Sequence, residues 1–83
     1  MKYRKTKHAE KVLNERNISD EWLERVLENP ELTEPDEIDP ELEHRLGKIE
    51  EFGNRVLRVI INVRRRPVLI ITAYFDRNMK GQV

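Results

Sequence analysis

The chain has 83 residues, no cysteine, and equal numbers of basic (16) and acidic (16) side chains. This length predicts one domain, and the lack of cysteine excludes a disulfide framework and a thiolate metal site. Its content of Leu, Ile, Val and Phe and its zero net charge favour a folded chain over a disordered one. The longest strongly apolar stretch, residues 68–75, is too short to cross a bilayer, and no apolar signal region follows the basic start. We therefore expect a single cytoplasmic domain over residues 1–83, without membrane contact.

The zero net charge hides a segregation of charge along the chain. Residues 1–17 carry six basic and two acidic side chains, and residues 44–83 carry nine basic and three acidic ones. Between them, residues 18–43 carry one basic and eleven acidic side chains. The overall charge therefore gives no indication of nucleic-acid binding, and only the charge of the individual segments bears on it.

Two helices are predicted at the N-terminal end. The first begins at Thr6, a candidate N-cap, and ends near Arg16, which lies on an apolar stripe otherwise formed by Ala9, Val12 and Leu13. His8 lies on the flank of that stripe. The second helix begins after Ser19 and ends at Asn29, because the following proline disfavours helical geometry in the residue before it. Its buried face consists of Trp22, Leu23, Val26 and Leu27.

An acidic, proline-rich connection follows over residues 29–41. It holds three prolines among its acids, and only Leu32 and Ile38 are available to anchor it. Long irregular connections of this kind are usually functional or mobile. The simplest interpretation is a solvated loop. The functional interpretation is a nucleic-acid mimic over a basic face, or a docking segment for a basic partner.

Three strands are predicted after the connection, over about residues 42–49, 55–64 and 68–76. Alternate residues of the second and third strands are wholly apolar, which is typical of strands with one buried face. A three-residue loop over 65–67 places residue 64 opposite residue 68 and puts both apolar sets on the same face. The predicted core of the sheet then consists of Leu57, Val59, Ile61, Leu69, Ile71 and Phe75.

The same register pairs Arg58 with Tyr74 on the opposite face. The predicted fold is therefore α+β, with two N-terminal helices packed on one face of a three-stranded antiparallel sheet in the order α-α-β-β-β. Arg58 and Tyr74 lie on the face that the helices leave uncovered. A structure in which they point into the core would contradict this register.

Few kinds of chemistry are available to such a chain. It has only two histidines, His8 and His44, and its acids lack the glycines of a calcium loop, so no metal site and no cofactor are expected. It has no glycine-rich phosphate loop, nucleophile elbow or paired-carboxylate motif. Metal-free cleavage of RNA by internal transesterification needs a base, a cation at the phosphoryl oxygens, and an acid for the leaving 5′-oxygen. The basic and aromatic side chains of this sequence suffice for those roles.

Each candidate also has a simpler structural interpretation. His8, near a helix start, is typical of a surface or half-buried packing residue, and Arg16 on an apolar stripe is typical of an arginine paired with a carboxylate. Arg58 opposite Tyr74 is a common cross-strand contact. Residues 64–66, three consecutive arginines, are most simply a soluble hairpin tip that prevents edge aggregation.

Several segments resemble the bacterial domain-of-unknown-function 4258 family. They are Thr6-Lys7-His8-Ala9 with Arg16 and Ile18-Ser19, the Asn29-Pro30 stop, Arg55-Val56-Leu57-Arg58-Val59, Thr72-Ala73-Tyr74-Phe75-Asp76-Arg77, and Met79-Lys80-Gly81. That family is similar to BrnT-like toxins of the RelE-like group of small metal-independent ribonucleases. The resemblance implies a compact α+β fold and, at second hand, an RNA-cleaving role. It differs at Val12, where many relatives carry a basic residue, and in the long acidic connection.

The resemblance matches His8 and Arg16 to the family's helix-one residues, and Arg58, Tyr74 and Arg77 to its strand positions. The sequence thus predicts a metal-independent endoribonuclease of toxin–antitoxin type, whose partners are RNA and a cognate antitoxin protein. Its expected catalytic residues are His8, Arg58 and Tyr74, and its expected RNA contacts are Arg16, Arg45, Lys48, Arg77 and Lys80. His8, Arg58, Tyr74 and Arg77 are expected to converge on one basic patch. The alternative is a non-catalytic module that binds RNA or a protein through the same face.

Overall fold

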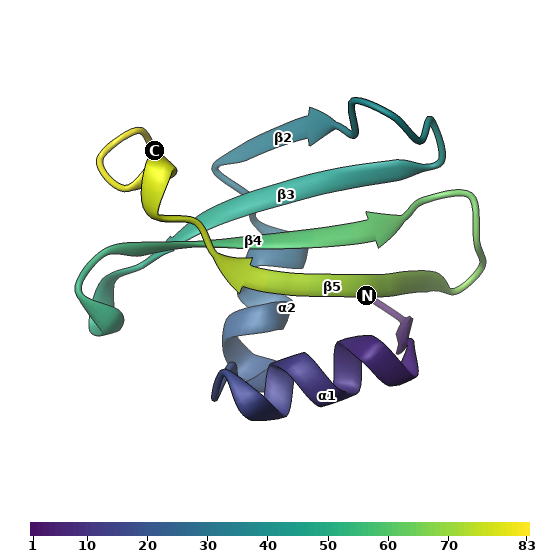
Figure 1. Cartoon of the computed structure of the whole chain (residues 1–83), viewed down its shortest axis with the longest axis horizontal. Coiled ribbons are helices and arrows are strands. Elements are labelled where there is room, and N and C mark those ends of the chain that lie inside the picture. The colour runs from purple at the N-terminus through teal and green to yellow at the C-terminus, as the bar shows by residue number, and fades with distance from the viewer.

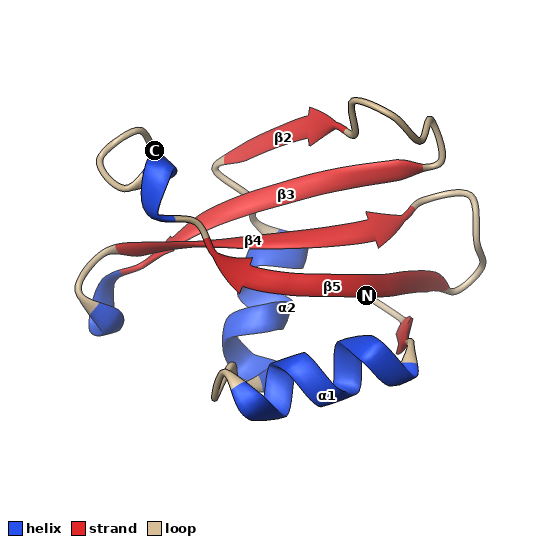
Figure 2. Cartoon of the chain, in the orientation of Figure 1, coloured by secondary structure: helices blue, strands red, loops and turns tan.

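Two helices and a five-stranded sheet make up the computed structural model, which describes residues 1–83 (Figures 1 and 2). The helices are α1 (Lys7–Glu15) and α2 (Asp20–Glu28). The strands are β1 (Tyr3–Lys5), β2 (Leu32–Pro35), β3 (Leu42–Ile49), β4 (Arg55–Asn62) and β5 (Val68–Phe75). Single 3₁₀ turns follow β3 and β5, namely η1 (Glu50–Phe52) and η2 (Arg77–Met79).

Both helices begin at the caps that the sequence predicts. The Thr6 hydroxyl accepts a hydrogen bond from the backbone N–H of Ala9, and the Ser19 hydroxyl accepts one from Trp22. Each cap satisfies a donor that has no partner within its own helix. Neither helix has the length and apolar composition needed to cross a bilayer.

The expected three-stranded antiparallel sheet is wrong. The sheet has five strands in the order β1-β5-β4-β3-β2, and β1 runs parallel to β5 while the other pairs are antiparallel. The two unexpected strands are both at edges and only three and four residues long. β2 lies inside the acidic connection, and Pro35 ends it at an edge where a missing N–H costs nothing in the sheet. Such short polar strands give almost no periodicity signal.

The register of β4 and β5 matches the predicted one over its first half. Leu57 lies opposite Phe75, and Arg58 lies opposite Tyr74. Ile60 still lies opposite Thr72, but Ile61 lies opposite Ile70, so Ile71 is an extra residue that forms a β-bulge in β5 and shifts the pairing by one. A one-residue shift moves side chains to the other face of the sheet.

The bulge overturns part of the predicted core. Ile70 is completely buried in the core, whereas Leu69 and Ile71, which the sequence placed there, lie outside it and are only half-buried. Leu69 pairs with Asn62 on the uncovered face of the sheet. The core lies between the helices and the face of the sheet that they cover. It consists of Ala9, Leu13, Ile18, Leu23, Val26, Leu27, Ile49, Leu57, Val59, Ile61, Ile70 and Ala73.

Helix α1 lies along the outer edge of β5, on the side away from β4, where no other strand pairs with it. β1 pairs only with residues 68–70 of β5. Beyond them, side chains of α1 and its cap bind the edge: Thr6 Oγ1 donates to the carbonyl of Ile71 (3.3 Å), and Arg16 Nη1 donates to that of Ala73 (2.7 Å). His8 Nε2 is hydrogen-bonded with Thr72 Oγ1 (3.2 Å). The helix thus supplies hydrogen-bond donors to carbonyl groups at the edge of β5 and fixes His8 and Arg16 beside that edge.

Candidate nucleic-acid interface

A groove of about 690 Å³ lies at the C-terminal end of β5, where α1 ends and β4 begins. We call it the cationic groove. Four of its lining residues are basic and one is acidic. The lining residues are Arg16, Arg55, Val56, Tyr74, Phe75, Asp76, Arg77 and Lys80.

None of the four basic side chains in the cationic groove forms an ion pair. Arg16 donates to a backbone carbonyl, and Arg55 lies over the Phe52 ring at 4.4 Å from its centroid. Arg25, Arg45 and Arg58 elsewhere in the chain each bind a carboxylate. The charges of the groove are therefore not compensated within the protein, and an anionic ligand meets them without breaking a salt bridge.

The C-terminal segment that carries Arg77 and Lys80 is held by Asp76. The backbone N–H of Asp76 donates to the carbonyl of Val56 (2.9 Å), and its carboxylate accepts from the N–H of Asn78 (3.0 Å). These bonds turn the chain back after β5 into η2, the yellow turn in Figure 1. The turn brings the two cations to the wall of the groove.

Arg58 lies on the uncovered face, as predicted, but in a different environment from the one expected. Its side chain donates from Nε to Asp76 Oδ2 (2.9 Å) and from Nη1 to Glu34 Oε2 (3.3 Å). Nη1 also lies 2.8 Å from His44 Nδ1. A guanidinium only donates, so His44 Nδ1 accepts, and the ring proton sits on Nε2 and is donated to Asp36 Oδ1 (2.6 Å). We call these five residues the Arg58 cluster.

The Arg58 cluster is acidic, because one guanidinium faces three carboxylates and a neutral imidazole. Arg58 is only 9 % exposed. The N–H of Asp39, the His44 ring and the N–H of Ile38 together lower the pKa of Asp36 and keep it ionised. The acidic segment after β2 is thereby fastened over Arg58. The expectation that Arg58 offers a free charge to a phosphate is not met in this arrangement.

The structure brings four of the predicted site residues together in the cationic groove: Arg16, Tyr74, Arg77 and Lys80. His8 does not line the groove, but its partner Thr72 lies two residues from Tyr74 on the same face of β5. Arg58 lines a separate acidic hollow with Glu34, Asp36 and His44. The two sites share Asp76, which lines the groove and binds Arg58.

Two predicted contacts lie away from the groove. Arg45 lies on the helix-covered face, where Nε donates to Glu43 (2.8 Å) and Nη1 donates to the carbonyl of Leu27 at the end of α2 (2.8 Å). Arg45 therefore does not share the face on which Arg58 and Tyr74 lie. Lys48 lies opposite Val56 on the uncovered face, outside the groove lining.

Arg55 lines the groove and was not among the predicted site residues. The signal was present in the sequence, since Arg55 opens the strand that pairs antiparallel with the strand ending at Phe75. The first residue of one such strand lies near the last residue of the other. That rule alone places Arg55 beside Tyr74 and Arg77.

Comparison with known proteins supports a family but no activity. No curated protein and no solved structure matches the chain. One family matches residues 6–75, which include α1, α2 and β2 to β5 but neither β1 nor the turn that carries Arg77 and Lys80. With this match over most of its length, the chain belongs to the family described as "Domain of unknown function (DUF4258)".

Proposed function

We propose that this protein binds single-stranded RNA in the cationic groove. The observation that carries the proposal is the set of four unpaired basic side chains around Tyr74. Arginine presents a planar fork of donors that fits phosphate oxygens, and a tyrosine ring offers a surface on which an unstacked base packs. The groove has both features, whereas the Arg58 cluster has no tyrosine and its arginine is paired with carboxylates.

The side chains of the groove determine how strongly RNA affinity should depend on salt and on stacking. Each phosphate contact with a single strand adds about 0.7 to the slope of log affinity against log salt concentration, so four contacts give a slope near −3. Stacking of one base on Tyr74 contributes about 1–3 kcal/mol. Affinity should therefore fall steeply with salt and depend on one aromatic ring.

Fluorescence anisotropy with a labelled uridine decamer over a series of salt concentrations tests this proposal. Arg77→Ala should weaken binding and flatten the salt slope by about 0.7. Tyr74→Ala should weaken binding by about 1–3 kcal/mol and leave the slope unchanged. Arg64→Ala is the matched control, because Arg64 is exposed and lies outside the groove. Absence of binding at low salt, or equal binding by the Arg77 and Arg64 variants, would contradict the proposal.

Metal-independent cleavage of the bound RNA is the second candidate, and one juxtaposition favours it. Helix α1 fixes His8 against Thr72 and Arg16 against Ala73, directly before Tyr74. Thr72 and Tyr74 point to the same face, about 7 Å apart along the strand. A group able to transfer protons on α1, another on β5 and an unpaired cation therefore meet at one stretch of β5.

In this candidate reaction, the 2′-oxygen attacks the phosphorus, the bond to the 5′-oxygen breaks, and a 2′,3′-cyclic phosphate forms. One of His8 and Tyr74 takes the 2′-OH proton, and the other gives a proton to the leaving 5′-oxygen. Arg16 replaces Arg58 as the cation at the phosphoryl oxygens, because carboxylates occupy Arg58.

Cleavage is tested on RNA with and without a chelator. We expect products ending in a 2′,3′-cyclic phosphate, unchanged rates with chelator, and no cleavage of DNA, which lacks the 2′-OH. His8→Ala should slow cleavage by about 100-fold or more while RNA binding persists. RNA that is bound and never cut would rule out the enzyme and leave the non-catalytic binding module.

A further inference from the structure

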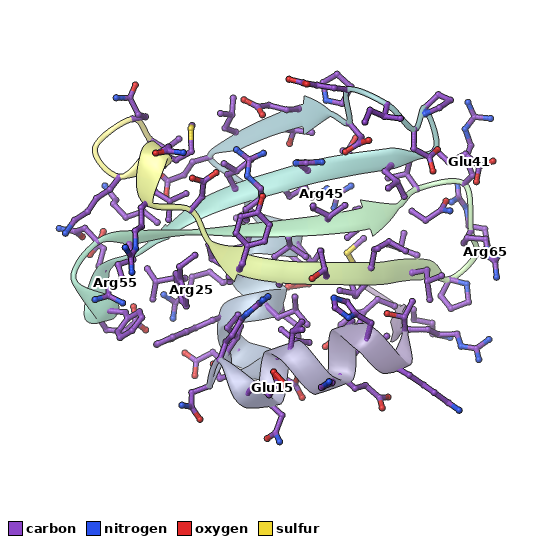
Figure 3. All side chains as sticks on the ribbon, viewed as in Figure 1. Glu15, Arg25, Glu41, Arg45, Arg55 and Arg65 are labelled. Carbon is purple, nitrogen blue, oxygen red and sulfur yellow. The ribbon has the colours of Figure 1, made fainter.

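A second basic hollow lies at the opposite end of β5 from the cationic groove. It measures about 310 Å³ and has no acidic lining residue. It is lined by Arg4, Lys5, Thr6, Arg65, Arg66, Pro67 and Leu69. Figure 3 shows the two ends clearly, because Arg55 of the groove and Arg65 of this hollow lie at opposite ends of the sheet. We call it the distal hollow.

Three guanidinium groups in the distal hollow have no acidic partner. Arg4 and Arg65 form no ion pair, and Arg66 donates only to the backbone carbonyls of Val63 (2.8 Å) and Arg65 (3.1 Å). Lys5 is the exception, since its ammonium binds Asp20 (2.7 Å). The hollow therefore gathers uncompensated charge of the kind that binds phosphate in a bidentate manner.

The β-bulge aligns the distal hollow with the groove on one face. In a regular strand, residues an odd number of positions apart point to opposite faces. The bulge at Ile71 reverses this alternation, so Leu69 points to the same uncovered face as Thr72 and Tyr74. Arg4 pairs with Leu69 in the parallel ladder and so shares that face. Phe75 in the groove lies six positions after Leu69 in the hollow, a distance of about 20 Å along β5.

We infer that the distal hollow is a second phosphate site for the same RNA strand, which runs along the uncovered face of β5. The inference rests on the proposed function of the groove. A fully stacked strand advances about 3.4 Å per nucleotide, so at most about six nucleotides bridge the two sites, and fewer when the strand is extended. His8, bound to Thr72, lies between the two sites on this path.

Oligonucleotide length tests the second site, with a uridine trimer and a uridine decamer as probes. The trimer reaches the groove alone, whereas the decamer spans both sites. The wild-type protein should bind the decamer at least tenfold more tightly than the trimer, since the second contact is made within one complex. An R4A/R65A variant should lose that advantage, bind the trimer unchanged, and show a decamer salt slope flatter by about 1.4.

Arg64→Ala is again the matched control, because it removes one exposed charge from the same hairpin without touching the distal hollow. Arg4 and Arg65 are also exposed, so their removal leaves the core intact. The double variant removes two charges and the control removes one. If the loss of decamer affinity for each charge removed is the same in both, the second site is overturned. Failure of wild-type protein to bind either probe would overturn the proposed function as well, so the two failures are distinct.

Discussion

The β-bulge in β5 predicts that Ile70 and Ile71 respond differently to truncation. Ile70 is completely buried in the core, whereas Ile71 is half-buried outside it. Ile70→Ala removes three carbon groups at about 0.8 kcal/mol each and leaves a cavity, so we expect a loss of about 2–5 kcal/mol. Ile71→Ala removes the same atoms from a site that is already partly solvated, and we expect a loss of about 1 kcal/mol.

Urea denaturation of the two variants measures this difference directly. Both variants should keep the wild-type dependence on denaturant, so that the shift in midpoint reports stability alone. An uninterrupted strand would bury residue 71 and turn residue 70 outward. Equal losses, or a larger loss for Ile71→Ala, would therefore refute the bulge and, with it, the alignment of Leu69, Thr72 and Tyr74 on one face.

Two predictions concern ionic contacts, and both are checked by denaturation, the first of them at several pH values. Arg25 first, then the N–H of Glu51 itself, and more weakly Trp22, hold the pKa of Glu51 at about 2, below its ordinary 4.5. The contribution of Glu51 to stability is therefore complete above pH 4.5 and lost as the pH falls to about 2. Glu51→Gln should melt earlier than wild type near neutral pH, and the difference should vanish in acid; a difference that persists would refute this. Arg58→Gln leaves the Asp76 and Glu34 carboxylates without their cation and should cost about 3 kcal/mol at neutral pH, whereas a loss of less than about 1 kcal/mol, as for an exposed ion pair, would contradict it.

The helices and the pairing of the central strands are predictable because their signals are local. Thr6 and Ser19 are strong N-caps, and apolar spacing defines the helical faces. The alternation along β4 and β5 correctly predicts that Arg58 lies opposite Tyr74. Pattern and turn length are enough to fix a register that buries one face.

The bulge and the edge strands escape prediction because their causes are not local. Residues 68–71 are all apolar, so alternation there cannot tell which side chain is buried. β1 and β2 owe their place to pairing with β5 and β3 rather than to a pattern of their own. Tertiary context decides both cases.

The candidate site was likewise predictable from the sequence only in part. Of the four residues expected to converge on one basic patch, Tyr74 and Arg77 line the groove, whereas His8 and Arg58 do not. The sequence gives no warning that Glu34 and Asp36 fold back onto Arg58, because that contact depends on the path of the acidic connection. Long-range ion pairs of this kind follow from the fold and are invisible in a single sequence.

The central claim is that RNA binds the cationic groove, and chemical-shift mapping of the isotope-labelled protein with a uridine decamer tests it most directly. We predict perturbed amide signals for Arg16, Arg55, Tyr74, Arg77 and Lys80, with residues 36–41 of the acidic segment unchanged. Perturbations confined to residues 36–41, or none at all, would contradict the claim.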